Sequence, residues 1–69
     1  MRRNISQKIG EKVRKARKLV GITQEALSVK THLHLSSVNR IENGKINPTF
    51  STLNKIARVL GVNPRDLIP

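Results

Sequence analysis

The sequence contains no cysteine, and of its 69 residues only Phe50 is aromatic. Without cysteine the chain can form neither disulfide bonds nor thiolate metal sites, which is compatible with a reducing cytoplasm. Proteins that hold single-stranded nucleic acids stack successive bases on several aromatic side chains. A single aromatic residue therefore argues against RNA recognition and against single-strand binding.

Acidic residues and long apolar runs are also scarce. Aspartate and glutamate number 4 against 14 lysines and arginines, which gives a formal net charge of +10. This excess indicates a polyanionic partner but says nothing about the fold. Nucleic acid is the first candidate, duplex DNA in particular, and an anionic membrane surface is the second. No apolar stretch approaches the roughly 20 residues of a membrane span, and none follows the basic start as in a signal peptide.

The chain also lacks the residue patterns of catalysis. A length of 69 residues allows one small domain with a thin core. We find no Ser/His/Asp set, no paired carboxylates and no glycine-rich phosphate loop, so we expect no enzyme. His32 and His34 have no third ligand type nearby in the sequence. We therefore expect neither a metal site nor any other cofactor.

The spacing of apolar residues predicts an all-α fold. From residue 5 to residue 20, apolar side chains recur on one face at about 100° per residue. Further helical patterns follow in residues 49–60 and, after an Asn-Pro pair, in a last turn. The stripes consist of Ile5, Ile9, Val13, Ala16 and Val20 in the first helix and Leu53, Ile56, Ala57 and Leu60 in the later one, which Thr49 or Ser51 should cap. We predict a compact bundle of about five short helices over residues 5–69, after a flexible basic arm at residues 1–4.

Two short helical patterns lie between these elements. One begins at the capping residue Thr23 and runs to about residue 30, and the other runs from about His34 to Asn43 before Gly44. Two short helices joined by a tight turn form the helix-turn-helix pattern of DNA-binding proteins. If Val38 and Ile41 face inward, the second helix points four side chains outward: Leu35, Ser36, Asn39 and Arg40.

These outward residue types suit the edges of DNA bases. Arg40 can donate two hydrogen bonds to guanine, and Asn39 can pair with adenine or contact a phosphate. Ser36 is small and adaptable. Leu35 would meet a thymine methyl group, although it could instead pack against the preceding helix.

The chain resembles the lambda-repressor-like family, also called Cro-repressor or XRE-type, of helix-turn-helix DNA-binding domains. The matching stretches are ITQEALS, NRIENGKINPTFSTLNKIARVLGV and NPRDLI, and the resemblance covers about Ile9 to Ile68. Two positions depart from the family pattern. Ser28 stands where the family often has alanine, and His32 stands where it often has glycine, so His32 would need a left-handed or strained backbone.

The resemblance implies roles for further residues. Gln24 would hold a DNA phosphate and brace the recognition helix, and Asn43 and Lys45 would meet the sugar-phosphate backbone. Arg17 and Glu42 would form an ion pair that joins the first helix to the end of the third. Because helix N-termini favour anions, we also assign Thr23 and His34 to phosphate contacts. Simpler alternatives stay open, namely solvated surface charges at positions 40 and 45, an exposed polar residue at position 24, and helix caps at positions 34 and 43.

We therefore expect a sequence-specific double-stranded DNA-binding transcriptional regulator, a dimeric repressor that reads the major groove with its third helix. The partners would be a palindromic operator and a second copy held through Leu67 and Ile68, with no small-molecule ligand and no membrane. It would act in the cytoplasm of a bacterium or archaeon, or be phage-encoded. A phage-type repressor, an antitoxin, a restriction-modification controller and the N-terminal reader of a larger repressor fit equally well. A protein-interaction module of this fold and a cationic membrane-surface peptide are the rivals from other classes.

Overall fold

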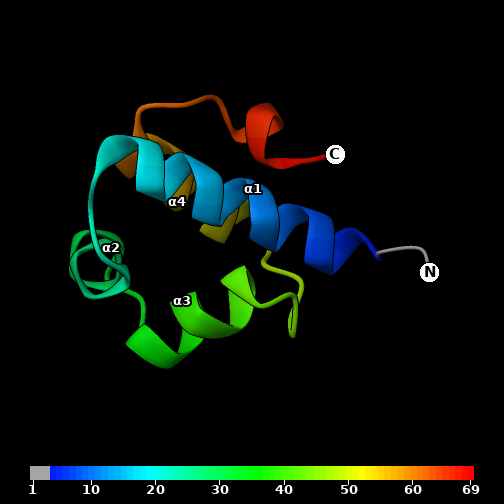
Figure 1. The fold of residues 1–69 in the computed structure, drawn as a ribbon, viewed down its shortest axis with the longest axis horizontal. Coiled ribbons are helices and arrows are strands. Elements are labelled where there is room, and N and C mark those ends of the chain that lie inside the picture. The colour runs from blue at the N-terminus through cyan, green and yellow to red at the C-terminus, as the bar shows by residue number, and fades with distance from the viewer. Residues whose placement is uncertain (1–3) are drawn as a thin grey trace.

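A computed structural model describes residues 4–69, which fold into a small helical bundle (Figure 1). Its elements are α1 (Ile5–Val20), α2 (Gln24–Thr31), α3 (Leu35–Glu42), α4 (Phe50–Leu60) and a 3-10 helix, η1 (Pro64–Leu67). The all-α class is confirmed, and the fifth predicted helix is the 3-10 turn. Within residues 4–69 no strand forms, and no helix has both the length and the apolar character needed to cross a membrane.

Local side-chain chemistry begins α1. The Gln7 backbone N–H donates to Asn4 Oδ1 at 2.8 Å, and the Asn4 N–H donates to Gln7 Oε1 at 3.0 Å. This reciprocal capping box stabilises the first turn. Asn4 therefore belongs to the folded domain and not to the predicted arm. The rest of that arm, residues 1–3, lies outside the described residues.

Threonine hydroxyls cap two further helices. Thr23 Oγ1 accepts from the Ala26 N–H at 3.0 Å, and Thr49 Oγ1 accepts from the Thr52 N–H at 3.1 Å. Each such cap stabilises a helix by about 1 kcal/mol. Of the two caps predicted for α4, Thr49 is the one used, and Ser51 lies inside the helix.

One apolar core holds the elements together. In Figure 1, α1 crosses the molecule with α2 and α3 on one side and η1 on the other, and α4 lies behind it. Contacts join α1 to α3, α4 and η1, while α4 also packs on α2. The buried core consists of Ile9, Val13, Leu27, Val38, Ile41, Leu53, Ile56, Ala57, Leu60 and Leu67.

Three apolar residues depart from their predicted places. Ile5 and Val20 were assigned to the buried stripe of the first helix, yet they are 59% and 48% exposed. Ile5 and Val20 are the first and last residues of α1, while the core covers Ile9 and Val13 nearer its middle. Leu67 was assigned to a dimer contact and is only 1% exposed. Its side chain completes the core of its own chain, so a partner subunit cannot reach it.

Gly10 sets how closely α1 approaches α3. A Cβ atom at this position would lie 2.3 Å from the Ile41 carbonyl oxygen and 2.7 Å from that of Glu42. No side chain fits there, so the backbones of the two helices touch at the C-terminal end of α3. The position of α3 on the bundle thus depends on a missing side chain in the middle of α1.

Candidate nucleic-acid interface

A left-handed residue makes the turn between α2 and α3. His32 has φ 60° and ψ 28°, and it is the one non-glycine residue with positive φ in residues 4–69. The Leu33 N–H donates to the Ser28 carbonyl at 3.1 Å, and the His32 N–H donates to the Val29 carbonyl at 3.3 Å. These two bonds close α2 in the usual way for a left-handed C-cap. His32 therefore adopts the conformation that the family's glycine would supply, and the two helices keep the helix-turn-helix arrangement.

The four predicted base-contacting residues share one exposed face of α3. Leu35 is 45% exposed, and Ser36, Asn39 and Arg40 are exposed as well. The opposite face contributes Val38, Ile41 and Glu42 to the interior. The helix is thus anchored on one side and open on the other, which is the geometry that groove insertion requires.

A buried ion pair fixes the end of α3 to α1. Arg17 Nε donates to Glu42 Oε2 at 2.7 Å, and Arg17 Nη2 donates to Glu42 Oε1 at 3.0 Å. A third bond runs from Arg17 Nη1 to the Ile22 carbonyl at 2.8 Å. The hydrogen bonds to Glu42 raise the pKa of Arg17 above its ordinary value, and burial opposes that shift less strongly. Since Arg17 neutralises Glu42, this carboxylate does not repel an anion that approaches α3.

Gln24 connects this ion pair to the exposed face of α3. Its Nε2 donates to Glu42 Oε1 at 3.0 Å, and its Oε1 accepts from Asn39 Nδ2 at 3.4 Å. Asn43 Nδ2 in turn donates to Asn39 Oδ1 at 3.1 Å. A chain of hydrogen bonds thus runs from Arg17 in the interior to Asn39 and Asn43 at the surface. Gln24 is half-buried within it, so it is more than an exposed polar residue of the first turn.

Sequence reasoning missed three links of this chain, the bonds from Gln24 to Glu42, from Asn39 to Gln24 and from Asn43 to Asn39. The bond between Asn39 and Asn43 joins residues four apart on a helix, a spacing at which side chains face each other, so it could have been found. The bond between Gln24 and Glu42 spans 18 residues. No periodicity in the sequence indicates such a contact, because it depends on the crossing of α2 and α3.

The remaining predicted phosphate contacts lie at the start of α2 and at the two ends of α3. Thr23 precedes α2 and, while its oxygen caps Ala26, its hydroxyl proton can still be donated. His34 occupies the N-cap position of α3, but its exposed imidazole makes no capping hydrogen bond there. Asn43 follows the other end of α3 as its C-cap residue, and Lys45 is exposed just beyond it. Polar or cationic groups therefore lie at both ends of the helix.

This site offers hydrogen-bond donors, acceptors and positive charge. In residues 4–69 no group of three or more histidine, aspartate or glutamate side chains is placed to hold a metal ion. Every buried polar side-chain atom in this part of the chain has a hydrogen-bond partner. The arrangement suits the recognition of another molecule through its hydrogen-bonding groups and negative charges.

Comparisons with known proteins agree with this geometry. A family model described as helix-turn-helix matches residues 13–67. The control protein C.BamHI of Bacillus amyloliquefaciens is 36% identical over 69 residues, covering 99% of this chain and 85% of that protein. The crystal structure of the restriction-modification controller protein C.AhdI from Aeromonas hydrophila superposes with a TM-score of 0.87 at 32% identity, covering 91% of this chain and 96% of that one.

A third similarity concerns the fold alone. The clp gene regulator ClgR from C. glutamicum gives a TM-score of 0.92 at 18% identity, over 97% of this chain and 86% of that one. The same helical arrangement is therefore kept while most of the sequence changes. From the matched family model, the relative that is 36% identical over 99% of this chain, and the shared arrangement of α2 and α3, the chain belongs to the lambda-repressor-like helix-turn-helix family of DNA-binding transcriptional regulators.

Proposed function

We propose that this regulator reads a specific duplex sequence by placing the exposed face of α3 in the major groove. The observation that carries the proposal is the hydrogen-bond chain from Arg17 through Glu42 and Gln24 to Asn39. It holds a base-reading side chain in place before DNA arrives. A side chain ordered in advance loses less conformational freedom on binding, so more of its interaction energy contributes to affinity.

Arg40 and Asn39 are the proposed readers of base identity. The exposed guanidinium of Arg40 can donate two parallel hydrogen bonds to guanine O6 and N7. The Asn39 amide keeps one N–H and one lone pair beyond its bonds to Gln24 and Asn43, which is what adenine N7 and N6 require. Leu35, about half exposed, would meet a thymine methyl, with Ser36 beside it. The buried half of Leu35 agrees with the alternative that it packs within the chain, and both contacts can coexist.

The residues around α3 would hold the phosphates. Thr23 and Gln24 would do so from the start of α2, His34 from the start of α3, and Asn43 and Lys45 from beyond its end. Such contacts fix the orientation of the protein on the duplex without reading its sequence. The exposed imidazole of His34 would bind a phosphate more strongly when protonated.

We further propose that two copies bind a palindromic operator, with half-sites one DNA turn apart, about 34 Å. Ile68 is 42% exposed and remains available for a dimer contact, whereas Leu67 is not. Ile68→Lys should weaken self-association in sedimentation equilibrium. Val29→Lys, at an exposed apolar residue of α2, is the matched control. A wild-type chain that stays monomeric at high concentration, with and without operator DNA, would refute the homodimer.

Among the narrower roles we favour control of a restriction-modification system. The supporting observation is that the restriction-modification controller protein C.AhdI and the control protein C.BamHI both match nearly all of this chain. We also infer that the chain acts without catalysis and in the cytoplasm, where the proposed DNA partner lies. A reporter gene placed behind candidate restriction-modification promoters distinguishes this role from that of an antitoxin. An antitoxin would require a toxin as its partner.

Selection from random duplexes, followed by sequencing, tests the proposal. We expect one enriched motif with two inverted halves, and an affinity for it that falls steeply with salt because lysine and arginine contacts release counterions. The rival function, a protein-interaction module of the same fold, predicts no enriched motif and little salt dependence. That outcome would reject DNA reading by α3.

A further inference from the structure

A shallow groove lies between α1 and η1, and Figure 1 shows α3 on the opposite side of α1. We propose that this groove binds an acidic amphipathic segment of a partner protein. Since α1 packs against both α3 and η1, it separates the two surfaces. A partner in the groove would leave the exposed face of α3 open to DNA. The proposal goes beyond DNA binding and does not depend on it.

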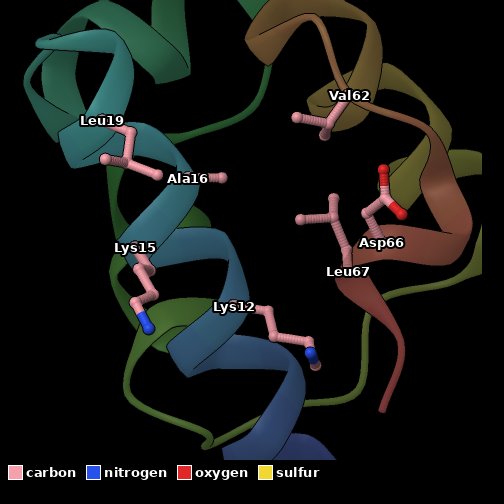
Figure 2. Close-up of a pocket in the computed structure, with 7 residues that line it drawn as sticks. All are labelled: Lys12, Lys15, Ala16, Leu19, Val62, Asp66 and Leu67. Carbon is pink, nitrogen blue, oxygen red and sulfur yellow. The ribbon is translucent and has the colours of Figure 1, made fainter.

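The floor and one rim of the groove are apolar. Ala16, Val62 and Leu67 point toward one another across it (Figure 2), and Leu67 belongs to the core. Leu19 lies on the rim and is 84% exposed, more than any other large hydrophobic side chain in residues 4–69. A single exposed leucine on a flat surface needs no explanation. This one stands beside a hollow with an apolar floor, where an apolar side chain of a partner would bury it.

Lysines give the groove its charge. Lys12 and Lys15 line the apolar hollow, and both also line an adjoining hollow with Lys8, Glu11 and Pro69, where three lysines outnumber the one acidic side chain. Within residues 4–69 neither Lys12 nor Lys15 forms an ion pair. The one acidic residue of the hollow between α1 and η1, Asp66, accepts from the Asn63 N–H at 3.2 Å and caps η1. The surface therefore changes from apolar at one end to cationic at the other.

The apolar end and the cationic end of the groove together determine which partner we infer. A segment with leucine-like side chains at one end and carboxylates along its length complements both parts of the groove. A second copy of the chain would bring the same lysine-lined rim against this one, and like-charge contacts disfavour that pairing. Duplex DNA would satisfy the lysines but has no apolar group for Leu19 to cover. An acidic amphipathic protein segment satisfies both.

The test uses a labelled synthetic helix with leucine at alternating third and fourth positions and glutamate elsewhere. Fluorescence anisotropy would measure its affinity for the full chain, alone and bound to the selected duplex. Binding to the DNA-bound chain excludes competition at α3. We expect Leu19→Glu to weaken binding about tenfold, equivalent to about 1.4 kcal/mol, and Lys12→Glu with Lys15→Glu to do the same.

Matched controls separate the groove from general charge. Arg14→Glu with Lys18→Glu makes the same charge change on α1 outside the groove, and Val29→Glu places the same side chain as Leu19→Glu at another exposed apolar site. We expect each control to change the affinity less than about twofold, a surface effect. All the substituted residues are exposed, so the variants should fold, which circular dichroism would verify.

Several results would overturn the proposal. The first is that Leu19→Glu binds the probe as tightly as the wild type does. The second is that a probe with glutamine in place of glutamate binds as tightly as the original probe. The third is that the probe is released when duplex is added. Reduced self-association of Leu19→Glu would instead assign the groove to a second copy. Reduced binding of Leu19→Glu to anionic phospholipid vesicles, with unchanged peptide binding, would assign it to a membrane. If the chain binds the probe but no duplex, only the proposed DNA function fails.

Discussion

The two faces of α3 follow different rules. The inner face buries Val38, Ile41 and Glu42, and the outer face exposes Leu35, Ser36, Asn39 and Arg40. Changes on the inner face should alter the free energy of unfolding, because they leave cavities or unpaired charge. Changes on the outer face should leave stability nearly unchanged and alter DNA affinity. Under the proposed function, one short helix thus divides its residues between holding the fold and reading DNA.

The largest expected effect comes from the inner face. Glu42→Ala leaves the guanidinium of Arg17 without its carboxylate in a buried position. We expect the free energy of unfolding to fall by about 3 kcal/mol or more, measured by urea denaturation. DNA binding would be lost with the fold. Glu25→Ala, at an exposed residue of α2, should cost less than about 1 kcal/mol.

A double variant shows whether unpaired charge causes that loss. Replacing Arg17 by methionine and Glu42 by leucine removes both charges and fills their space with apolar side chains. Since buried pairs can be replaced by apolar residues at little cost, this variant should be more stable than Glu42→Ala. If it is not, the pair contributes through its geometry on α3 and not through charge compensation.

The second effect concerns the contact between α1 and the inner end of α3. Alanine usually stabilises a helix relative to glycine by about 1 kcal/mol. For Gly10→Ala we expect the reverse, a loss of about 2 kcal/mol in thermal or urea unfolding, because the new Cβ would overlap the Ile41 carbonyl oxygen. Arg14→Ala, at an exposed position of the same helix, should change stability little. A stabilised Gly10→Ala would mean that α1 and α3 can separate without cost.

The third effect belongs to the outer face. Arg40→Ala should reduce affinity for the selected operator by about 1–3 kcal/mol and relax the preference at one base pair. Its unfolding free energy should change by less than about 0.5 kcal/mol. Binding titrations with the operator and with its single-base variants measure the affinity and the preference at that base pair. Arg58→Ala, an exposed arginine on α4, is the control. Equal losses on operator and random DNA would contradict base reading by Arg40.

The smallest effect is expected beyond the end of α3. Lys45→Ala should weaken binding to operator and random duplex alike, and it should lower the slope of log affinity against log salt by about one. Lys55→Ala on α4 removes the same charge from another element and should leave the slope unchanged. A loss confined to the operator would make Lys45 a reader of sequence.

Local chemistry made much of the fold predictable. Gly21 and Gly61 end α1 and α4 with positive φ, and each directly follows the last apolar residue of a predicted stripe, Val20 or Leu60. The inward positions Val38 and Ile41 are buried as predicted. Turns and caps depend on neighbouring residues, so the sequence contains the information directly. The same periodicity placed all four proposed base-contacting residues on one face of α3.

Other features depend on contacts between distant residues. Nothing in the apolar pattern distinguishes Leu67, which is buried in the core, from Ile68, which is exposed. The bond from Gln24 to Glu42 and the place of Gly10 against α3 arise only when separate helices cross. The groove between α1 and η1 likewise requires both ends of the chain.

The sequence by itself determined where the helices begin and end, which face of α3 points outward, and a charge suited to a polyanion. Helix periodicity, capping and net charge are local or additive properties, so they can be read along the chain. Only the tertiary structure decided which side chains Gln24 bonds to as it braces α3, which apolar ends stay exposed, and where a second surface forms. Those outcomes depend on how closely the helices approach one another, and residues far apart in the sequence set that distance together.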